Sequence, residues 1–389
     1  MGTRSGGRLR LTAVAAVVCG ATAVGAGACG TGEGDRLRSD AEAIVATGVT
    51  GVQARVTGPD GASESVAAGV SDTGDDRPVA PDGHFRIGSV NKTLVAAVLL
   101  QLAAEERLSL DDTVDSWLPG LVRGNGHDGR LMTVRQLLQH TAGVHDGAYP
   151  VRGGSAERYR ENHDEPYTPE EVVAAAMGGA PDFAPGEGWS YSNTGYVLLG
   201  MVVERATGRP WQDEVEARIL GPLGMRDTVW PGDDPGLPEP HAHGYTRFAP
   251  GEELVDTTAL VDADASGGYV STTADLDRFA RALFDGTLLD EAGRAELTET
   301  VPVGEDDTPW EGAGYGLGIF SRALSCGGTV WIPSGDQIGY RTRIGVTGDG
   351  RNSVVVSMST QLQDSADSAL AQEAAATELI DNALCAARD

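Results

Sequence analysis

The sequence predicts an α/β fold of the α+β type, in which one antiparallel sheet is built from both chain ends, is flanked by helices and carries an inserted, mainly helical lobe. Strand patterns lie near both termini, and helical patterns with long loops fill the middle. A chain of 389 residues with 40% hydrophobic content can also bury a large core. We therefore expect one domain, residues 29–389, with a sheet lobe at about 40–110 and 270–389 and a helical lobe at about 111–269.

The amino terminus has the pattern of a secretory signal. Three arginines within the first ten residues precede an apolar run at 11–24, and small residues follow as far as Ala28. The run is too short for a membrane-spanning helix, so we expect residues 1–28 to be a signal peptide. Cys29 is a candidate lipidation site, and a freely secreted form is the alternative because Ala26 fits such sites poorly. The expected location is extracellular, or anchored to the outer face of the cell membrane.

The net charge limits the kinds of molecule that the protein could bind, and the cysteines indicate a possible disulfide. Removing residues 1–28 takes away three arginines and no acid, so the formal net charge moves from −28 to −31. Such a surface repels nucleic acid, which is therefore not an expected partner. Cys326 and Cys385 remain in the body of the chain, where an exported protein could oxidise them to a disulfide. Two buried free thiols are the alternative.

Strand signals begin after a polar stretch to which no element is assigned. Residues 52–58 and 64–70 predict two strands joined by a P-D-G turn. Near the other terminus, strands are expected at 329–332, 340–346 and 353–359, with T-G-D-G as the turn between the last two.

Helical signals lie between and after these strands. The sequence from 92 to 107 is apolar nearly all round, which predicts a helix buried in the middle of the protein. Further helices are expected at 133–140, 169–177, 194–206, 274–284 and 366–387.

The buried helix begins beside a candidate nucleophile and its base. Lys92 is the only lysine among 29 basic residues, and it follows Ser89 by three positions, so the two side chains share one helix face. A serine hydroxyl is a weak nucleophile until a base removes its proton, and arginine cannot be that base. Burial would lower the pKa of a lysine ammonium toward the range where the neutral amine exists. The amino end of a helix also stabilises developing negative charge.

Two longer stretches carry a family resemblance. F-R-I-G-S-V-N-K at 85–92 and F-A-P-G-E-G-W-S-Y-S-N-T-G-Y-V-L-L-G at 183–200 together resemble the serine D-alanyl-D-alanine carboxypeptidases and class C β-lactamases. That family of penicillin-recognising serine hydrolases also contains esterases and D-amino-acid amidases. Similar stretches occur at 131–144, 219–228, 266–276 and 314–318, and the likeness covers about residues 40–360.

The resemblance implies a β-lactamase/transpeptidase-like fold and an acyl-enzyme mechanism. Tyr191 and Asn193 match the family's Y-x-N, in which the tyrosine relays protons between nucleophile and leaving group and the asparagine orients lysine and substrate. The implied activity is that of a D-alanyl-D-alanine carboxypeptidase, which cleaves peptidoglycan stem peptides with Ser89 as the nucleophile. The resemblance also implies a possible reaction with β-lactams. No metal or organic cofactor is expected, and the protein is expected to be a monomer.

The family's third element departs from its pattern here. That element is a basic residue, then Ser, Thr or Gly, then Gly, on a strand facing the serine. Aligning the G-Y at 339–340 puts Pro333 in the place of the usual lysine or histidine. A lost cation predicts that Tyr191 ionises less readily. Alternatively, Arg341 or Arg343 supplies the missing charge.

The residues after Pro333 are the candidate substrate-binding segment. They are Ser334, Gly335 and Asp336, the last at a place where the family often meets the substrate's carboxylate. An anion there would repel a carboxylate, which predicts slow cleavage of peptides with a free carboxyl terminus and slow reaction with β-lactams. The backbone N–H of Asp336 should still pair with that of Ser89 as an oxyanion hole.

Two other functions stay open. An esterase or an amidase for substrates with a free ammonium is one, because Asp336 would attract that ammonium. A non-catalytic cell-wall binding or sensor protein is the other, motivated by Pro333 and opposed by the intact catalytic set.

Remaining signals are assigned structural roles. His241 and His243 lack a third ligand at suitable spacing, so no metal is expected. His140 is expected to tie down a loop at a helix end, and V-D-A-D-A at 261–265 to be a solvated loop. No G-x-S-x-G occurs, which leaves an α/β-hydrolase without support.

Overall fold

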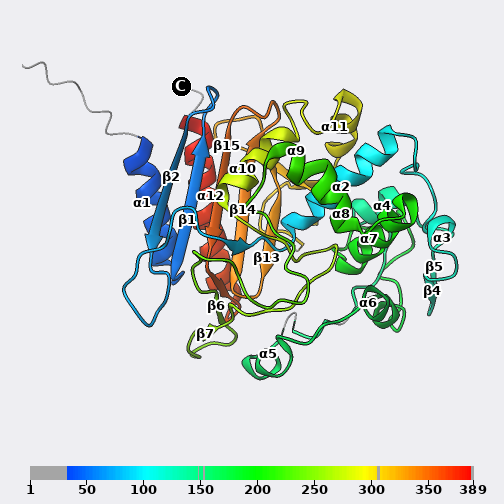
Figure 1. The fold of residues 1–389 in the computed structure, drawn as a ribbon, viewed down its shortest axis with the longest axis horizontal. Helices are drawn as coiled ribbons and strands as arrows, with labels where there is room; N and C mark the ends of the chain where they lie inside the picture. Colours follow the sequence, from blue (N-terminus) through cyan, green and yellow to red (C-terminus); the bar gives the residue numbers. More distant parts are fainter. Residues whose placement is uncertain (1–32, 148, 152–153, 305–306, 387–389) are drawn as a thin grey trace, which may run out of the picture.

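Strands from both ends of the chain meet in one antiparallel sheet, as predicted (Figure 1). The computed structural model describes residues 33–147, 149–151, 154–304 and 307–386, so the predicted signal peptide and Cys29 lie outside the described residues. In spatial order the strands are β2 (Ser63–Gly69), β1 (Gly51–Thr57), β15 (Ser353–Met358), β14 (Tyr340–Thr347), β12 (Thr329–Ile332), β11 (Phe320–Ala323), β10 (Gly314–Tyr315) and β9 (Val301–Pro302). A ninth strand, β13 (Ser334–Gln337), also pairs with β14.

The pairing of β1 with β15 joins the two termini. Val52 lies opposite Met358 and Thr57 opposite Ser353, so the amino-terminal hairpin extends the sheet made by the carboxyl-terminal strands. The predicted strands at 52–58, 64–70, 329–332, 340–346 and 353–359 are confirmed within one residue at each end.

One face of the sheet is covered by α1 (Glu33–Ala46) and α12 (Ala366–Ala386), which lie side by side (Figure 1). No element was expected in the polar stretch before residue 52, and α1 corrects that. Leu37, Ala41 and Ile44 recur at helical spacing and are buried against the sheet, although charged residues surround them in the sequence.

The other face carries α10 (Thr273–Ala282) and the helical lobe. The lobe and the helices packed on it comprise α2 (Val90–Ala104), α3 (Val114–Trp117), α4 (Val134–Leu138), α5 (Ala156–Asn162), α6 (Pro169–Ala176), α7 (Asn193–Thr207), α8 (Trp211–Val215), a π-helical turn (Glu216–Leu220), α9 (Gly221–Leu223) and α11 (Glu291–Leu297).

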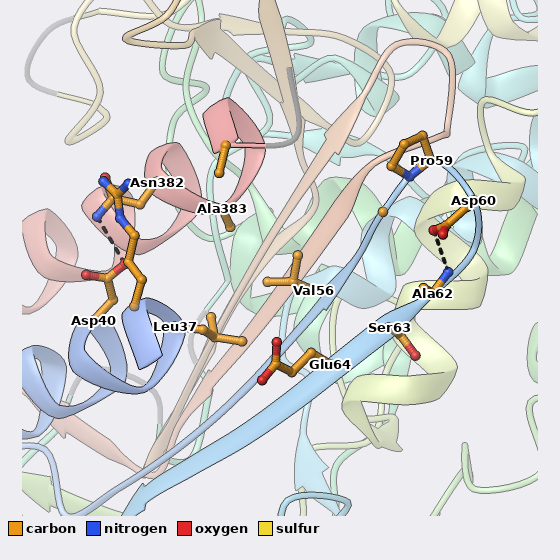
Figure 2. A pocket seen from close by; sticks show the side chains of 13 residues that line it. Leu37, Asp40, Val56, Pro59, Asp60, Ala62, Ser63, Glu64, Asn382 and Ala383 are labelled. Atoms are coloured by element: carbon orange, nitrogen blue, oxygen red, sulfur yellow. Dashed lines mark hydrogen bonds between the residues drawn. The ribbon is translucent and has the colours of Figure 1, made fainter. Parts of the chain in front are cut away.

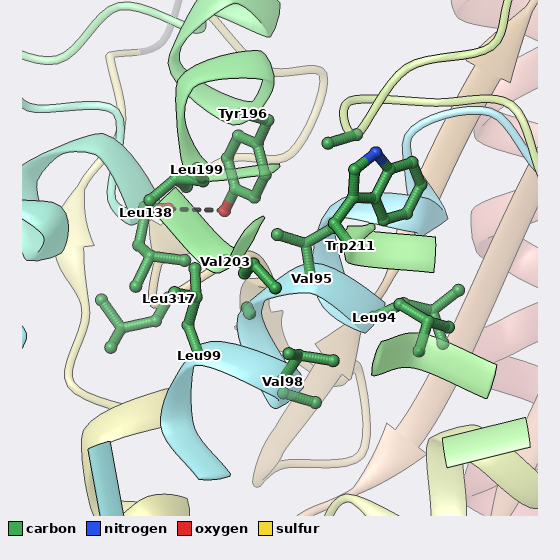
Figure 3. Packing of buried hydrophobic residues seen from close by; sticks show 14 of the residues in the cluster. Leu94, Val95, Val98, Leu99, Leu138, Tyr196, Leu199, Val203, Trp211 and Leu317 are labelled. Carbon is green, nitrogen blue, oxygen red and sulfur yellow. Dashed lines mark hydrogen bonds between the residues drawn. The ribbon is translucent and has the colours of Figure 1, made fainter. Parts of the chain in front are cut away.

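The buried helix predicted after Ser89 is confirmed as α2. Twelve of its fifteen residues are buried, and Figure 3 shows Val95 and Leu99 among side chains of α7 such as Leu199 and Val203. A helix enclosed on all sides is a rigid support, so the residues at its amino end are held in fixed positions.

Short strands complete the fold. They are β3 (Phe85–Arg86) with β8 (Val270–Ser271), β4 (Arg123–Gly124) with β5 (His127–Asp128), and the trio β16 (Thr360–Leu362), β6 (Tyr245–Arg247) and β7 (Val255–Asp256). Pairing with β8 fixes β3 immediately before Ser89.

Cys326 and Cys385 form a disulfide with an S–S distance of 2.04 Å, which ties the turn after β11 to the end of α12. Across the described ranges, none of the helices combines the length and the apolar character needed to cross a membrane.

Candidate active site

Two glycines let β13 lie against the turn that carries Ser89. A Cβ on Gly335 would lie 1.9 Å from the carbonyl oxygen of Ile87 and 2.8 Å from the nitrogen of Ser89. A Cβ on Gly88, whose φ is +51°, would lie 2.7 Å from the carbonyl oxygen of Asp336. Only backbones without side chains can approach this closely. The backbones of Ser89 and Asp336 are thus neighbours, as an oxyanion hole built from both requires.

Ser89 stands at the amino end of α2 but does not cap the helix. A serine in this position usually accepts a hydrogen bond from a backbone N–H of the first turn, and here it makes no such bond. Its hydroxyl instead lies 3.0 Å from the Nζ atom of Lys92. The hydroxyl is therefore directed toward the lysine rather than used to stabilise the helix.

The Lys92 amine, 1% exposed, is held by three oxygen atoms. Nζ lies 3.0 Å from Ser89 Oγ, 2.8 Å from Asn193 Oδ1 and 2.8 Å from the carbonyl oxygen of Ser266. The amide and carbonyl oxygens can only accept hydrogen bonds, whereas the hydroxyl can also donate one. A neutral amine has two protons and one lone pair, so it can donate to the two carbonyl-type oxygens and accept the proton of Ser89. This geometry suits lysine as the general base.

Asp146 sets the orientation of the Asn193 amide, and sequence reasoning missed it. Its Oδ2 accepts from Asn193 Nδ2 at 3.0 Å, and its Oδ1 accepts from the backbone nitrogen of Thr194 at 2.9 Å. With Nδ2 bound to a carboxylate, the Oδ1 atom of Asn193 must face Lys92. The H-D pair at 145–146, inside the predicted helical lobe, gave no signal of this contact.

Tyr191 lies beside the lysine and is packed on a histidine. Lys92 Nζ is 4.8 Å from the centre of the Tyr191 ring, and the ring centre of His140 is 4.4 Å from the same point. His140 Nδ1 accepts from the backbone N–H of Ser192 at 3.2 Å, so His140 does hold the loop that carries Y-S-N. Burial lowers the pKa of His140 well below its usual value, and Lys92 lowers it further when its amine carries the proton. The imidazole that packs on Tyr191 is therefore neutral.

A cavity of about 320 Å³ opens over these groups. Ser89, Tyr191 and Asn193 line it together with the predicted substrate-binding segment, Ser334, Gly335 and Asp336. The structure thus brings the residues predicted from three separate motifs to one site.

The expected solvated loop at 261–265 is instead buried, which corrects that expectation. Asp262 is 7% exposed and lines the cavity, and Asp264 is 2% exposed. Asp264 Oδ1 accepts from the nitrogen of Ser266 at 2.7 Å and from its Oγ at 2.6 Å. Asp264 therefore positions Ser266, whose carbonyl oxygen accepts a hydrogen bond from Lys92.

Pro333 separates two short strands at the third element, because a proline has no backbone N–H to donate. It separates β12 from β13, and its carbonyl oxygen accepts from the nitrogen of Ile344 at 3.2 Å. The proline has no N–H to contribute to the ladder. The two strands consequently pair with β14 in separate segments.

Asp336 was expected to present an anion that repels a substrate carboxylate, and the structure adds that two arginines of β14 pair with this anion. Arg343 Nη1 lies 2.6 Å and Arg341 Nε 3.2 Å from Asp336 Oδ1. Both arginines also bind Glu373 of α12, at 2.7 Å and 2.9 Å. Although burial raises the pKa of Asp336, the two guanidinium charges outweigh it and hold that pKa below its usual value. Of the two predicted alternatives, the structure favours the one in which arginines stand beside this element.

Within the described ranges, no group of three or more His, Cys, Asp or Glu side chains could hold a metal ion. His241 contacts the carbonyl oxygen of Pro238, and His243 contacts the carboxylate of Asp256.

A second cavity, of about 540 Å³, lies between α1, the β1–β2 turn and α12 (Figure 2). Leu37, Val56 and Ala383 are apolar residues of its lining, which also contains Asp40 and Glu64. It has no serine–lysine pair among its lining residues, so the catalytic candidates belong to the smaller cavity.

A sequence model of the Beta-lactamase family matches residues 37–378. Among solved structures, the fold is similar to a D-stereospecific amidohydrolase from Streptomyces sp., with 38% identity and a TM-score of 0.79 over 87% of this chain and 98% of that one.

Two curated proteins are also similar. Esterase EstB of Burkholderia gladioli is 32% identical over 289 residues, which are 66% of this chain and 71% of the esterase. A penicillin-binding protein of Bacillus subtilis (strain 168) is 29% identical over 288 residues, or 70% of this chain, and the alignment spans only 60% of that protein's length.

Proposed function

The chain belongs to the β-lactamase family of serine hydrolases, and from that premise we propose that it hydrolyses esters and amides of D-amino acids through an acyl-enzyme on Ser89. The observation that carries the catalytic part is the bonding of Lys92 Nζ to Ser89 Oγ, Asn193 Oδ1 and the carbonyl of Ser266. A neutral Lys92 amine can donate to the two carbonyl-type oxygens and accept the proton of Ser89.

In the proposed first half-reaction, Ser89 Oγ attacks the substrate carbonyl carbon while its proton passes to Lys92. The carbonyl electron pair moves to the oxygen, where the backbone N–H groups of Ser89 and Asp336 stabilise it. The bond to the leaving group then breaks, Tyr191 delivers its hydroxyl proton to that group, and the proton held by Lys92 passes to Tyr191, which restores both side chains. Water attacks the resulting ester by the reverse route and releases the acid.

The substrate class is inferred from the third element and from the relatives. Asp336 lies where the family often binds a substrate carboxylate and already pairs with Arg341 and Arg343, which favours leaving groups without a negative charge. The similarity to a D-stereospecific amidohydrolase and to an esterase supports the same class.

D-alanyl-D-alanine carboxypeptidase activity on cell-wall peptides is the second candidate function. The similarity to a penicillin-binding protein and the presence of Arg341 and Arg343 beside the cavity favour it. A non-catalytic binding protein is disfavoured, because a lysine buried and bonded to the serine hydroxyl has no evident use without catalysis.

We also propose that the protein is exported, free or lipidated at Cys29. The signal pattern at residues 1–28 supports export, and the disulfide between Cys326 and Cys385 is of a kind that persists in oxidising compartments.

A panel of substrates tests the proposal with purified residues 30–389. It contains p-nitroanilides of D-alanine and L-alanine, a p-nitrophenyl ester, N-acetyl-D-alanyl-D-alanine and a penicillin. We expect turnover of the ester and of the D-anilide that is abolished in Ser89→Ala, with slower release of D-alanine from the dipeptide. Faster cleavage of the dipeptide than of the anilide would move the assignment to the carboxypeptidase.

A further inference from the structure

Arg341 and Arg343 point from one strand toward the carboxylate of Asp336 on its neighbour. Antiparallel pairing sets Asp336 opposite Arg341 and Ser334 opposite Arg343, so all four side chains project from the same face. Arg343 contacts both carboxylate oxygens, at 2.6 Å to Oδ1 and 3.3 Å to Oδ2, and Arg341 contacts Oδ1 at 3.2 Å. Guanidinium groups in this arrangement are the usual partners of a carboxylate.

Glu373 of α12 holds both arginine side chains, so their positions do not depend on Asp336 alone. Glu373 accepts from Arg343 at Nε and Nη2 and from Arg341 at Nη2, and its side chain is 4% exposed. The two arginine side chains are 5% and 10% exposed, whereas the side chain of Asp336 is 38% exposed. Asp336 is thus the one member of the cluster that faces the cavity to a substantial degree.

The cluster lies beside the nucleophile. Arg341, Arg343 and Asp336 line the same cavity as Ser89, and a Cβ on Gly335, the residue before Asp336, would lie 2.8 Å from the nitrogen of Ser89. A carboxylate on the leaving group of a substrate bound at Ser89 would therefore come close to this arginine pair.

We infer that Arg341 and Arg343 form a carboxylate-binding site that Asp336 fills from within the chain, so that the enzyme excludes substrates whose leaving group carries a free carboxylate. This inference rests on the proposed function, because it names a determinant of selectivity at the same site. Glu373 neutralises one of the two positive charges and Asp336 the other. Removal of the Asp336 side chain leaves one uncompensated positive charge and an open space in which an external carboxylate binds.

The activity test uses two substrates that share one scissile ester and differ only in terminal charge. These are N-acetyl-D-alanyl-D-lactate and N-acetyl-D-alanyl-D-lactamide. Asp336→Ala opens the site, and Asp336→Ser is the second variant in case the first does not fold. Asp307→Asn is the matched control, because it removes one negative charge from the lining of the same cavity and leaves the arginine pair filled.

We expect kcat/KM for the lactate substrate, divided by that for the lactamide, to rise about 10- to 100-fold in Asp336→Ala, as for a charged hydrogen-bonded pair gained. The ratio should change less than about 3-fold in Asp307→Asn, since a screened charge without a bound partner contributes little. An unchanged ratio in both Asp336 variants, or an equal rise in Asp307→Asn, would overturn the inference.

A binding test separates this inference from the proposed function. The melting temperature of Asp336→Ala should rise with sodium acetate, relative to sodium chloride at equal ionic strength, and that of the wild-type protein and of Asp307→Asn should not. Absence of turnover of either ester by the wild-type protein would refute the proposed function, and the acetate experiment would still decide the inference. Absence of an acetate-specific rise in both Asp336 variants would contradict it.

Discussion

Replacing Gly335 with alanine should move β13 away from the nucleophile and disable the oxyanion hole. The new Cβ would lie 1.9 Å from the carbonyl oxygen of Ile87, whereas such atoms do not approach within 3.0 Å. Relieving the overlap requires a shift of about 1 Å between the two backbones, which is enough to lower kcat by about 100-fold. The new Cβ is attached directly to the backbone of β13, and the carbonyl oxygen of Ile87 is itself a backbone atom. Both segments are buried, so neither atom can move aside as the end of a flexible side chain could.

The assay is steady-state hydrolysis of a p-nitrophenyl ester together with urea unfolding. We expect the free energy of unfolding to fall by about 1–3 kcal/mol, as for other overpacked buried sites. Gly195→Ala is the matched control, because its Cβ would be 3.7 Å from the nearest atom and lies in α7, close to the site. Activity of Gly335→Ala within a factor of two of the wild-type value, in a folded protein, would refute the argument that these backbones form the oxyanion hole.

Three further predictions concern the residues around the nucleophile. Lys92→Arg should lower kcat for the ester by about 10²- to 10⁴-fold, because a guanidinium cannot take the proton of Ser89; near-normal activity would contradict a base function. Asp146→Asn should lower kcat by about 10-fold with little change in KM, because its amide no longer fixes Asn193; an effect confined to KM would contradict this. The pKa of His140 is lowered in the folded protein, so below pH about 6.5 the imidazole binds a proton in the unfolded chain but not in the folded one. The free energy of unfolding therefore decreases as the pH drops, by at most about 1.4 kcal/mol per pH unit. Urea unfolding of His140→Gln should show a shallower fall between about pH 6.5 and 5, and an unchanged slope would exclude His140 as its source.

Local sequence patterns were sufficient for most of the fold. Strand alternation and the nearly uniform apolar run of α2 are local properties, so the positions of β1, β14, β15 and α2 followed directly. The helix α1 was missed because its charged residues hide an apolar stripe of only three buried residues, Leu37, Ala41 and Ile44. Its amphipathic spacing would have revealed it.

The candidate site was predictable where its chemistry needs a specific residue type. Lys92 stands out because every other basic residue is arginine, which cannot take a proton from Ser89, and the match to Y-x-N supplied Tyr191 and Asn193. What could not be predicted depends on pairings distant in sequence. Arg341 or Arg343 as a source of positive charge was a predicted alternative, but their bonds to Glu373 of α12, 32 and 30 residues further along the chain, were not predicted. No local sequence pattern predicts that these two arginines and Glu373 lie together.

Intact-mass spectrometry of the protein mixed with a slowly hydrolysed D-alanyl ester tests the central claim most directly, since that claim is a covalent intermediate on Ser89. The account predicts a mass increase equal to the acyl group, located by peptide mapping on Ser89 and absent in Ser89→Ala. An adduct that persists in Ser89→Ala, or hydrolysis at the wild-type rate by that variant, would contradict it.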